Sequence, residues 1–150
     1  MKITTKTFEE LTNKELYEIL QLRSEVFVIE QDCIYQDIDG KDNRALHVLG
    51  WEDGNLMAYA RCFQSGDYFE EAAIGRILVR ENYRKLGYGH KITKASIDAI
   101  KSKYEADKIK ISAQTYLVIF YERHGFKTIG DRYLEDGIPH IAMLRVSEKL

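Results

Sequence analysis

The stretch ILVRENYRKLGYGHKITKA, residues 77–95, constrains the fold of this chain more than any other segment. An apolar, β-type run changes there into a basic turn that contains two glycines. The apolar residues that follow have helical spacing: Tyr88, Ile92, Ala95 and Ala99. The period of the apolar pattern therefore changes from two to about 3.6, which predicts a strand that leads through a glycine turn into an amphipathic helix. We expect one face of this helix to pack on a sheet.

The other segments predict an α+β fold rather than a doubly wound parallel sheet. A helix is expected over residues 11–28. Thr12 and Glu15 have the spacing of a capping box there, and the apolar residues that follow repeat as on one buried helix face: Leu16, Ile19, Leu20 and Phe27. Asp53-Gly54-Asn55 separates two β-type runs and is the strongest hairpin signal in the chain. The expected order is a strand, a helix, three strands, a helix, a strand, a helix and two strands. The other expected elements are strands at 2–8, 72–80, 108–112, 126–133 and 138–146, a loop at 30–43, and a mostly buried helix at 115–125.

Composition and charge limit the classes of function. The chain has 150 residues, a single proline and no linker or internal repeat, so we expect one domain over residues 1–150. The 22 Lys and Arg residues oppose 24 Asp and Glu residues, and the net charge of −2 argues against nucleic acid or an anionic membrane as a partner. The first residues lack the apolar core of a secretory signal and no later run could span a bilayer, which predicts a soluble, cytoplasmic protein. Cys33 and Cys62 form no C-x-x-C pair and are expected to be ordinary thiols.

The junction at residues 77–95 has the composition of an anion-binding site. A helix start exposes unpaired main-chain N–H groups at the positive end of the helix dipole, and these groups suit phosphate oxygens. Gly87 and Gly89 allow a ligand to approach the main chain, while Arg84 and Lys85 add positive charge. A plain glycine turn between strand and helix explains the same residues equally well. The Walker phosphate loop and the Rossmann turn are excluded, because the first needs Ser or Thr after Gly-Lys and the second needs a third glycine.

Two motifs resemble those of the GCN5-related N-acetyltransferase (GNAT) family. The first is ILV followed by RKLGYG, which is similar to the family's apolar strand and its Q/R-x-x-G-x-G/A turn at a helix start. The second is KISAQTYLVIFYERHGF, which is similar to the family's downstream strand, polar residue and helix ending in Y-x-x-x-G-F. VFVIEQDCIYQDIDGKDN and EDGIPHI resemble the ElaA-like subgroup in particular. The resemblance covers essentially the whole chain, and implies a mixed, mostly antiparallel central sheet flanked by helices.

The resemblance also implies acetyl-CoA as a cosubstrate, with no metal. It places the pantetheine amides against the main chain of Ile77 and Val79, and the pyrophosphate against the N–H groups of residues 85–90. Gln114 stands where many family members carry an asparagine near the cofactor. The implied cofactor-binding residues are Ile77, Leu78, Val79, Arg84, Lys85, Leu86, Gly87, Tyr88, Gly89, His90 and Gln114.

The activity implied by the resemblance is direct acetyl transfer to a primary amine in a ternary complex. Such a transfer needs a neutral nucleophile, a polarised thioester carbonyl and a proton for the leaving thiolate. Tyr121 matches the family's general acid, although an aromatic residue packed in a buried helix fits this position nearly as well. The family places its general base variably, and the candidates here are Glu30, Glu25, His47 and His140, of which Glu30 is favoured by its place between helix and loop. A non-catalytic acyl-CoA-binding or regulatory module of the same fold is the competing interpretation.

The acceptor side is defined less sharply by the sequence. Residues 30–42 contain five acids and one base, a balance of −4, and are either a solvated face or a segment over the acceptor that attracts a cationic amine. We expect His47 and His140 to bind the acceptor, His140 because its hairpin commonly borders the substrate pocket in the resembled fold. The sequence contains no metal-binding motif and no G-x-S-x-G elbow of a serine hydrolase. It leaves the oligomeric state open, with a homodimer as one outcome.

Overall fold

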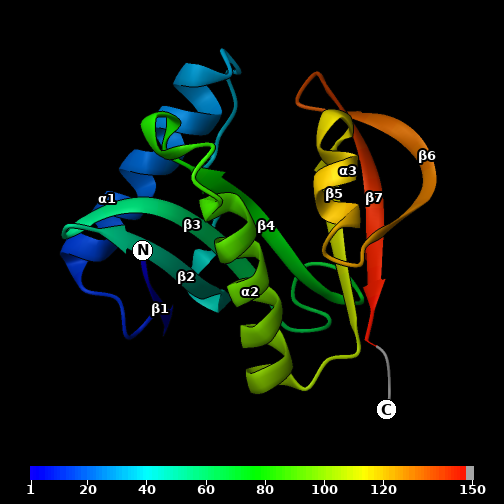
Figure 1. Ribbon diagram of the computed structural model, residues 1–150, viewed down its shortest axis with the longest axis horizontal. Coiled ribbons are helices and arrows are strands. Elements are labelled where there is room, and N and C mark those ends of the chain that lie inside the picture. The colour runs from blue at the N-terminus through cyan, green and yellow to red at the C-terminus, as the bar shows by residue number, and fades with distance from the viewer. Residues whose placement is uncertain (148–150) are drawn as a thin grey trace.

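A seven-stranded sheet forms the centre of the computed structural model, which describes residues 1–147. The strands lie in the order β1-β2-β3-β4-β5-β7-β6 (Figure 1). All neighbouring strands are antiparallel except β4 and β5, which are parallel. This architecture confirms the expected mixed, mostly antiparallel α+β fold. The strands are β1 (Lys2–Thr7), β2 (Leu46–Glu52), β3 (Asn55–Phe63), β4 (Ala72–Val79), β5 (Lys108–Gln114), β6 (Lys127–Glu135) and β7 (Ile138–Val146).

The first helix, α1 (Asn13–Arg23), begins with the expected capping box. The Thr12 side chain accepts a hydrogen bond from the Glu15 N–H, and the Glu15 carboxylate accepts one from the Thr12 N–H. The helix continues as a π-helix over Ser24–Glu30, so the helical segment ends within two residues of the expected boundary at residue 28, where only the π-helical geometry was not predicted.

The helix expected after the glycine turn is α2 (Tyr88–Tyr104). The last helix, α3 (Val118–Glu122), follows a 3-10 turn at Thr115–Leu117. This segment is shorter and less buried than the sequence predicts, because Tyr116 and Ile119 are exposed. Two further 3-10 turns lie at Asp42–Arg44 and Glu81–Tyr83.

Both faces of the sheet are covered by helices. One face packs against α2 and α3 in a cluster that contains Val48 and Ile92, and α2 crosses in front of the sheet in Figure 1. The other face packs against α1 in a cluster that contains Leu49, Ile19 and Leu22. The neighbours Val48 and Leu49 fall on opposite faces, as the two-residue period of a strand requires.

Two hairpins turn through Asp-Gly pairs. Asp53 and Gly54 join β2 to β3 with φ of 50° and 78°, and Asp136 and Gly137 join β6 to β7 with φ of 52° and 78°. Two-residue turns with positive φ at both positions match the twist of the strands they connect. The Asp53-Gly54 turn was expected from the sequence, and the structure confirms it.

The parallel strands β4 and β5 pair over a short length and then diverge. The register joins Ala72 to Ile109 and Ala73 to Lys110, and no later residue of β4 pairs with β5 within these two described strands. Figure 1 shows the two strands separating towards their C-terminal ends. This edge of β4, over residues 75–79, therefore faces an opening instead of a neighbouring strand.

A β-bulge lies on β4 beside this opening. Arg76 has a φ of 50°, and the register of β4 against β3 shifts here. The extra residue reverses the alternation of the strand, so that Ile74 and Ile77 both contact the cluster on the α2 side. Val79 follows Ile77 onto that face, whereas Leu78 packs against the α1 side. The bulge therefore gives the end of β4 its orientation towards the start of α2.

Candidate active site

The N-terminus of α2 lies at the end of the open edge of β4 and has no side-chain cap. Gly87 is the N-cap residue, with a φ of 78°, and the first turn carries no acidic side chain. The Lys91 N–H bonds to the Gly87 carbonyl at 3.1 Å, but within the described structure no protein group accepts a hydrogen bond from the main-chain N–H groups of residues 85–90. Free N–H groups at the positive end of a helix dipole can hold an anion.

The two glycines of this turn, Gly87 and Gly89, differ in main-chain conformation and in the space around them. Gly87 adopts the left-handed conformation, and a Cβ placed there would meet no atom within 4 Å. Gly89 is helical, but its Cβ would lie 3.4 Å from Phe120 and 3.9 Å from Val79. Gly87 therefore keeps the turn unstrained and the space before it open, whereas a Cβ at Gly89 would make only ordinary van der Waals contact with its neighbours.

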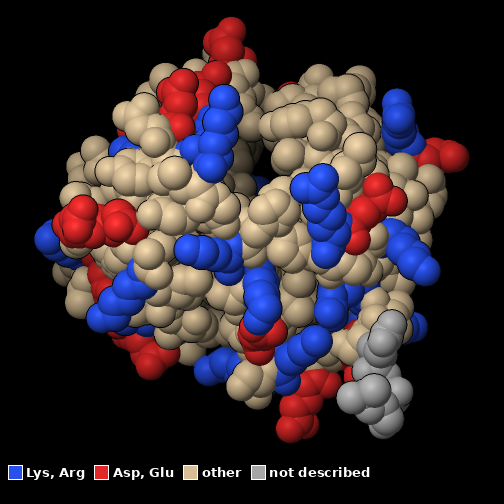
Figure 2. Space-filling model, viewed as in Figure 1, with Lys and Arg blue, Asp and Glu red and all other residues tan. Residues whose placement is uncertain are grey.

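Arg84 links the turn to the end of the first helical segment. Its Nε donates to the Val79 carbonyl at 2.9 Å, and its two Nη atoms contact the Glu30 carboxylate at 2.6 and 2.8 Å. The hydrogen bond that Arg84 donates to Glu30 raises the pKa of Arg84 above its ordinary value. Figure 2 shows a hollow between the two halves of the molecule, with basic side chains beside it over the loop before α2. Glu30, the favoured candidate for the general base, is thus ion-paired with Arg84 beside the turn that is predicted to bind the cofactor.

The other predicted cofactor residues differ in what they can offer a ligand. The Leu78 side chain is buried on the α1 side of the sheet, which leaves only its main chain for such a contact. Leu86 is exposed on the turn. The Tyr88 hydroxyl donates to Glu52 at 2.7 Å, and the His90 ring is stacked against α3.

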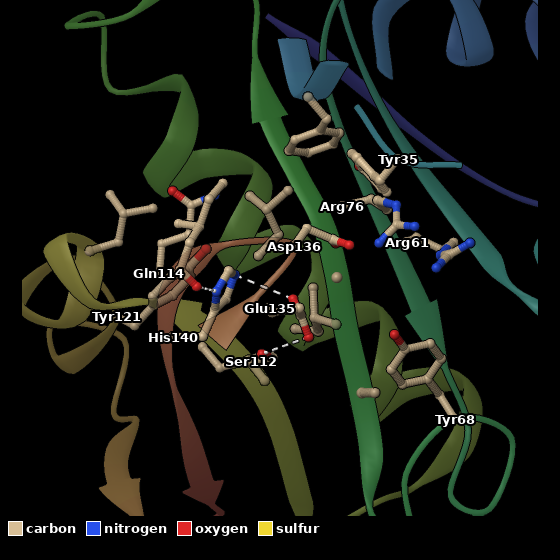
Figure 3. A pocket seen from close by; sticks show the side chains of 18 of the residues that line it. Tyr35, Arg61, Tyr68, Arg76, Ser112, Gln114, Tyr121, Glu135, Asp136 and His140 are labelled. Carbon is tan, nitrogen blue, oxygen red and sulfur yellow. Dashed lines mark hydrogen bonds and ion pairs between the residues drawn. The ribbon is translucent and has the colours of Figure 1, made fainter. Parts of the chain in front are cut away.

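A cavity occupies the place where β4 and β5 diverge (Figure 3). Its walls come from the segment after α1, from β3, β4 and β5, from α3 and from the β6–β7 hairpin. Four residues predicted from the sequence line it together: Ile77, Gln114, Tyr121 and His140. The structure therefore brings candidate donor-side and acceptor-side residues to one cavity, although they are far apart in the sequence.

Tyr121 presents a free hydroxyl to this cavity. Its ring is almost fully buried and packs edge-on against Phe120 and Phe126, with ring centroids 5.1 and 6.1 Å apart. Burial raises the pKa of Tyr121 above its ordinary value, so the hydroxyl keeps its proton at neutral pH. No described residue is hydrogen-bonded to this hydroxyl. It can therefore donate a proton or a hydrogen bond to a bound ligand.

A network of polar side chains lies beside Tyr121 in the cavity. The His140 Nδ1 lies 2.7 Å from the Ile138 carbonyl, and its Nε2 lies 3.3 Å from a Glu135 carboxylate oxygen. The Ser112 hydroxyl donates to the other Glu135 oxygen at 3.3 Å and is also hydrogen-bonded to Tyr133. Figure 3 shows Glu135 between His140 and Ser112. The pairing of β7 with both β5 and β6 brings these residues together.

The acidic segment at residues 30–42 is matched by arginines from α1, β3 and β4. The contacts of this Arg–Asp cluster are 2.6 to 3.0 Å long: Asp37 with Arg23 and Arg76, Asp39 with Arg61, and Asp42 with Arg23 and Arg61. Three aspartates and three arginines leave the cluster with no net formal charge. The segment is therefore not the source of an anionic field over an acceptor, and any attraction for a cationic amine has to come from other residues.

The Arg–Asp cluster predicts a loss of stability in acid. Burial opposes the ionisation of Asp39 and Asp42, but hydrogen bonds from Arg61 and Arg23 outweigh it and hold both pKa values below their usual range. The stabilisation is therefore present above the unfolded-state pKa of about 3.9 and is lost as pH falls through the lower folded-state values. Urea unfolding should show a free energy that is level above about pH 5 and declines below about pH 4. A free energy that stays level down to pH 3 would contradict this assignment.

Like Glu30, two other candidates for the general base lie outside the cavity. His47 is 0% exposed, and its ring nitrogens lie 2.6 Å from the Tyr59 hydroxyl and 2.9 Å from the Asp42 carbonyl. Burial lowers the pKa of His47, which favours the neutral ring. Glu25 pairs with Arg80 at 3.0 Å near the surface. Since both nitrogens of His47 are occupied inside the protein, the structure gives no support to its predicted contact with an acceptor.

Sequence reasoning missed Glu135 and Ser112. A signal for Glu135 was available, because the Asp136-Gly137 turn fixes the register of the hairpin and so brings the preceding residue near His140. Ser112 carried no such signal, since its place depends on the pairing of β5 with a strand that lies far along the chain.

Three further properties bear on the chemistry. Within residues 1–147, no group of three or more His, Cys, Asp or Glu side chains is placed to hold a metal ion. Among the described helices, none has the length and apolar character that crossing a membrane requires. Cys33 and Cys62 are both free thiols, and Cys62 is buried.

Comparison with known proteins identifies the family. The family model described as "Acetyltransferase (GNAT) domain" matches residues 7–146. Protein ElaA of Escherichia coli is 42% identical over 140 residues, which cover 91% of this chain and 90% of ElaA. The chain belongs to the GNAT acetyltransferase family. Its similarity to ElaA confirms the resemblance of its motifs to the ElaA-like subgroup.

Solved structures of GNAT relatives have the same fold. An acyl-CoA N-acyltransferase from Pseudomonas aeruginosa is 39% identical with a TM-score of 0.91, over 97% of this chain and all of that one. The crystal structure of Escherichia coli ElaA is 38% identical with a TM-score of 0.90, over 96% of this chain and 98% of that one. GNAT membership and this fold support acyl transfer as the general class of activity.

Proposed function

We propose that this protein transfers the acetyl group of acetyl-CoA directly to a primary amine in a ternary complex. One observation carries the proposal: the open edge of β4 leads from the cavity that holds the Tyr121 hydroxyl to the uncapped N-terminus of α2. A single opening thus offers a strand edge, a set of free N–H groups and a proton donor. These features suit a long ligand that ends in a diphosphate on one side and a thioester on the other.

The donor side fits acetyl-CoA by its hydrogen-bonding groups. The N–H groups of residues 85–90 would hold the pyrophosphate, and the main chain of Ile77 and Val79 would pair with the pantetheine amides. The Val79 carbonyl accepts a hydrogen bond from Arg84 here, so Arg84 would have to release it for that pairing. Gln114 lies on the cavity wall within the same opening.

The acceptor side fits a small nucleophile that enters the cavity from the other direction. Tyr121 would give its proton to the departing thiolate, since it is protonated and has no partner in the described structure. His140 would contact the acceptor, because it lines the cavity. Glu30 and Glu25 do not line the cavity, and a role for either as general base would require water between it and the amine.

Replacing Gly87 with valine is expected to weaken acetyl-CoA binding. The left-handed conformation costs a β-branched residue about 1–2 kcal/mol, so the turn should change shape and the dissociation constant should rise about five- to thirtyfold. Isothermal calorimetry measures this directly. Gly130→Val is the matched control, because Gly130 has a φ of 70°, has no atom within 4 Å of a Cβ, and lies on β6 at the far edge of the sheet. Equal affinity in Gly87→Val and the parent would rule out this placement of the pyrophosphate.

Initial rates of thiol release test the reaction as a whole. With acetyl-CoA and a primary amine both varied, a ternary complex gives reciprocal plots that intersect, whereas a covalent acetyl-enzyme gives parallel ones. We expect intersecting plots and no acetylated protein in the absence of amine. Binding of acetyl-CoA without thiol release by any amine would instead support the competing acyl-CoA-binding module.

A further inference from the structure

We propose that Glu135 is the residue that selects a cationic acceptor, namely a primary alkylammonium ion on an apolar or aromatic stem. The inference rests on the proposed acetyl transfer and names the acceptor class of the same cavity. It assigns the preference for cations to the β6–β7 hairpin, whereas the sequence had suggested the acidic segment at residues 30–42.

The geometry of Glu135 suits a bound ammonium ion. Its side chain lines the cavity and is 47% exposed, one of its oxygens accepts a hydrogen bond from the Ser112 hydroxyl at 3.3 Å, and the other lies 3.3 Å from the His140 Nε2. The Ser112 hydrogen bond orients the carboxylate, and neither contact is with an arginine or a lysine. A carboxylate has about four acceptor sites, which leaves room for the N–H groups of an ammonium ion.

The charges around the cavity also favour a cationic ligand. Four Lys, Arg, Asp or Glu residues line it. Two of them, Arg61 and Arg76, belong to the Arg–Asp cluster and have matched charges. The other two, Glu135 and Asp136, have no Lys or Arg partner in the described part of the chain. The unmatched charge is therefore negative and sits at the hairpin turn.

The wall opposite Glu135 determines which kind of acceptor molecule fits the cavity when its ammonium group contacts the carboxylate. Figure 3 shows Tyr35 and Tyr68 across the cavity, on the side of β3 and β4. Phe63 and Phe69 extend this aromatic wall, and the rings of Phe63 and Tyr68 are stacked with centroids 5.1 Å apart. Aromatic faces of this kind bind apolar stems and tolerate a nearby cation. An acceptor with an ammonium end and an apolar stem matches both walls.

The same contact allows the acceptor to become a nucleophile. A primary alkylamine has a pKa near that of lysine, about 10.4, so it arrives protonated at neutral pH. Glu135 takes one proton from the ammonium ion, and the nitrogen lone pair of the neutral amine attacks the thioester carbonyl carbon. The C–N bond forms as the C–S bond breaks, and Tyr121 gives its proton to the thiolate that leaves. The nitrogen, which still carries one proton too many for an amide, then gives that proton to the Tyr121 oxygen and restores the hydroxyl. The products are an N-substituted acetamide and free CoA, with one proton passed from Glu135 to solvent.

Three probes of one shape but different charge test the assignment: 2-phenylethylamine, 2-phenylethanol and 3-phenylpropionate. Calorimetry should show that the parent binds the amine at least tenfold more tightly than the alcohol and binds the carboxylate most weakly, since a charge-assisted hydrogen bond contributes about 1.5–3 kcal/mol. Glu135→Gln should lose this preference by about ten- to hundredfold. The matched control is Asp131→Asn, which removes the same charge from an exposed position on the same strand and outside the cavity.

The outcomes separate this inference from the proposed function. Selective amine binding that is lost in Glu135→Gln, without thiol release in the parent, would support the ammonium site and contradict acetyl transfer. Amine-dependent thiol release that is unchanged in Glu135→Gln would support acetyl transfer and overturn the role of Glu135. Equal binding of all three probes by the parent would also overturn it. Both variants should bind acetyl-CoA as the parent does, which excludes a general loss of structure.

Discussion

Tyr121→Phe should lower kcat by about 10² to 10⁴ with both substrates saturating, if general-acid catalysis is fully used. The substitution removes only the hydroxyl, which has no hydrogen-bond partner among the described residues. A thiolate with a pKa near 8.5 is already a tolerable leaving group, so turnover should be slowed and not abolished. The ring contacts with Phe120 and Phe126 remain, and the melting temperature and the affinity for acetyl-CoA should stay close to those of the parent.

Phe126→Leu is a suitable comparison for the structural role of this region. Phe126 is buried against Tyr121 but carries no group that can transfer a proton. We expect it to lower stability, while kcat measured on the folded protein changes little. Full turnover in Tyr121→Phe would show that Tyr121 is not the acid. A much lower melting temperature in Tyr121→Phe would show instead that the hydroxyl makes a structural hydrogen bond.

Arg23→Met should reduce the free energy of unfolding by about 3–5 kcal/mol. Arg23 is 0% exposed and contacts Asp37 at 2.8 Å and Asp42 at 2.6 Å. Methionine fills much of the same volume, but it leaves two largely buried carboxylates short of their partner, and the cost arises mainly from these unpaired charges. Urea unfolding at pH 7 measures the change.

Lys94→Met provides the matched control for the ion pair. Lys94 contacts Asp98 at 3.1 Å, but both side chains are more than half exposed. Such a pair between neighbouring turns of a helix contributes about 0.3–0.5 kcal/mol. A loss of less than about 1 kcal/mol in Arg23→Met would show that the Arg–Asp cluster does not hold the segment at residues 30–42 in place. Because that segment lines the cavity through Cys33 and Tyr35, where we propose that the amine binds, we also expect the KM for the amine to change more than that for acetyl-CoA.

The features that sequence predicted well are those set by local physics. The capping box at Thr12, the Asp53-Gly54 turn and the change of period before α2 each depend on neighbouring residues. Their conformations follow from helix termini, from positive φ and from the spacing of apolar side chains. The order of strands and helices could therefore be predicted, but the π-helical geometry of Ser24–Glu30 and the shortness of α3 could not.

The features that sequence could not predict depend on long-range pairing. Residues 30–42 appear strongly acidic in the sequence, but their partners Arg23, Arg61 and Arg76 come from three other elements. Likewise, Glu135 meets Ser112 only because β7 lies between β5 and β6 in the sheet. A formal charge count along the chain gives the sign of a segment, but not which of its charges have partners after folding.

The most direct test of the central claim is mass spectrometry of the products formed from acetyl-CoA and a panel of primary amines, with thiol release followed in parallel. The panel would include 2-phenylethylamine, polyamines, lysine peptides and amino sugars. The proposed reaction predicts one equivalent of N-acetylated amine for each equivalent of CoA released, with release that requires both the protein and the amine. Acetyl-CoA that binds the protein but remains intact with every amine in the panel would contradict acetyl transfer.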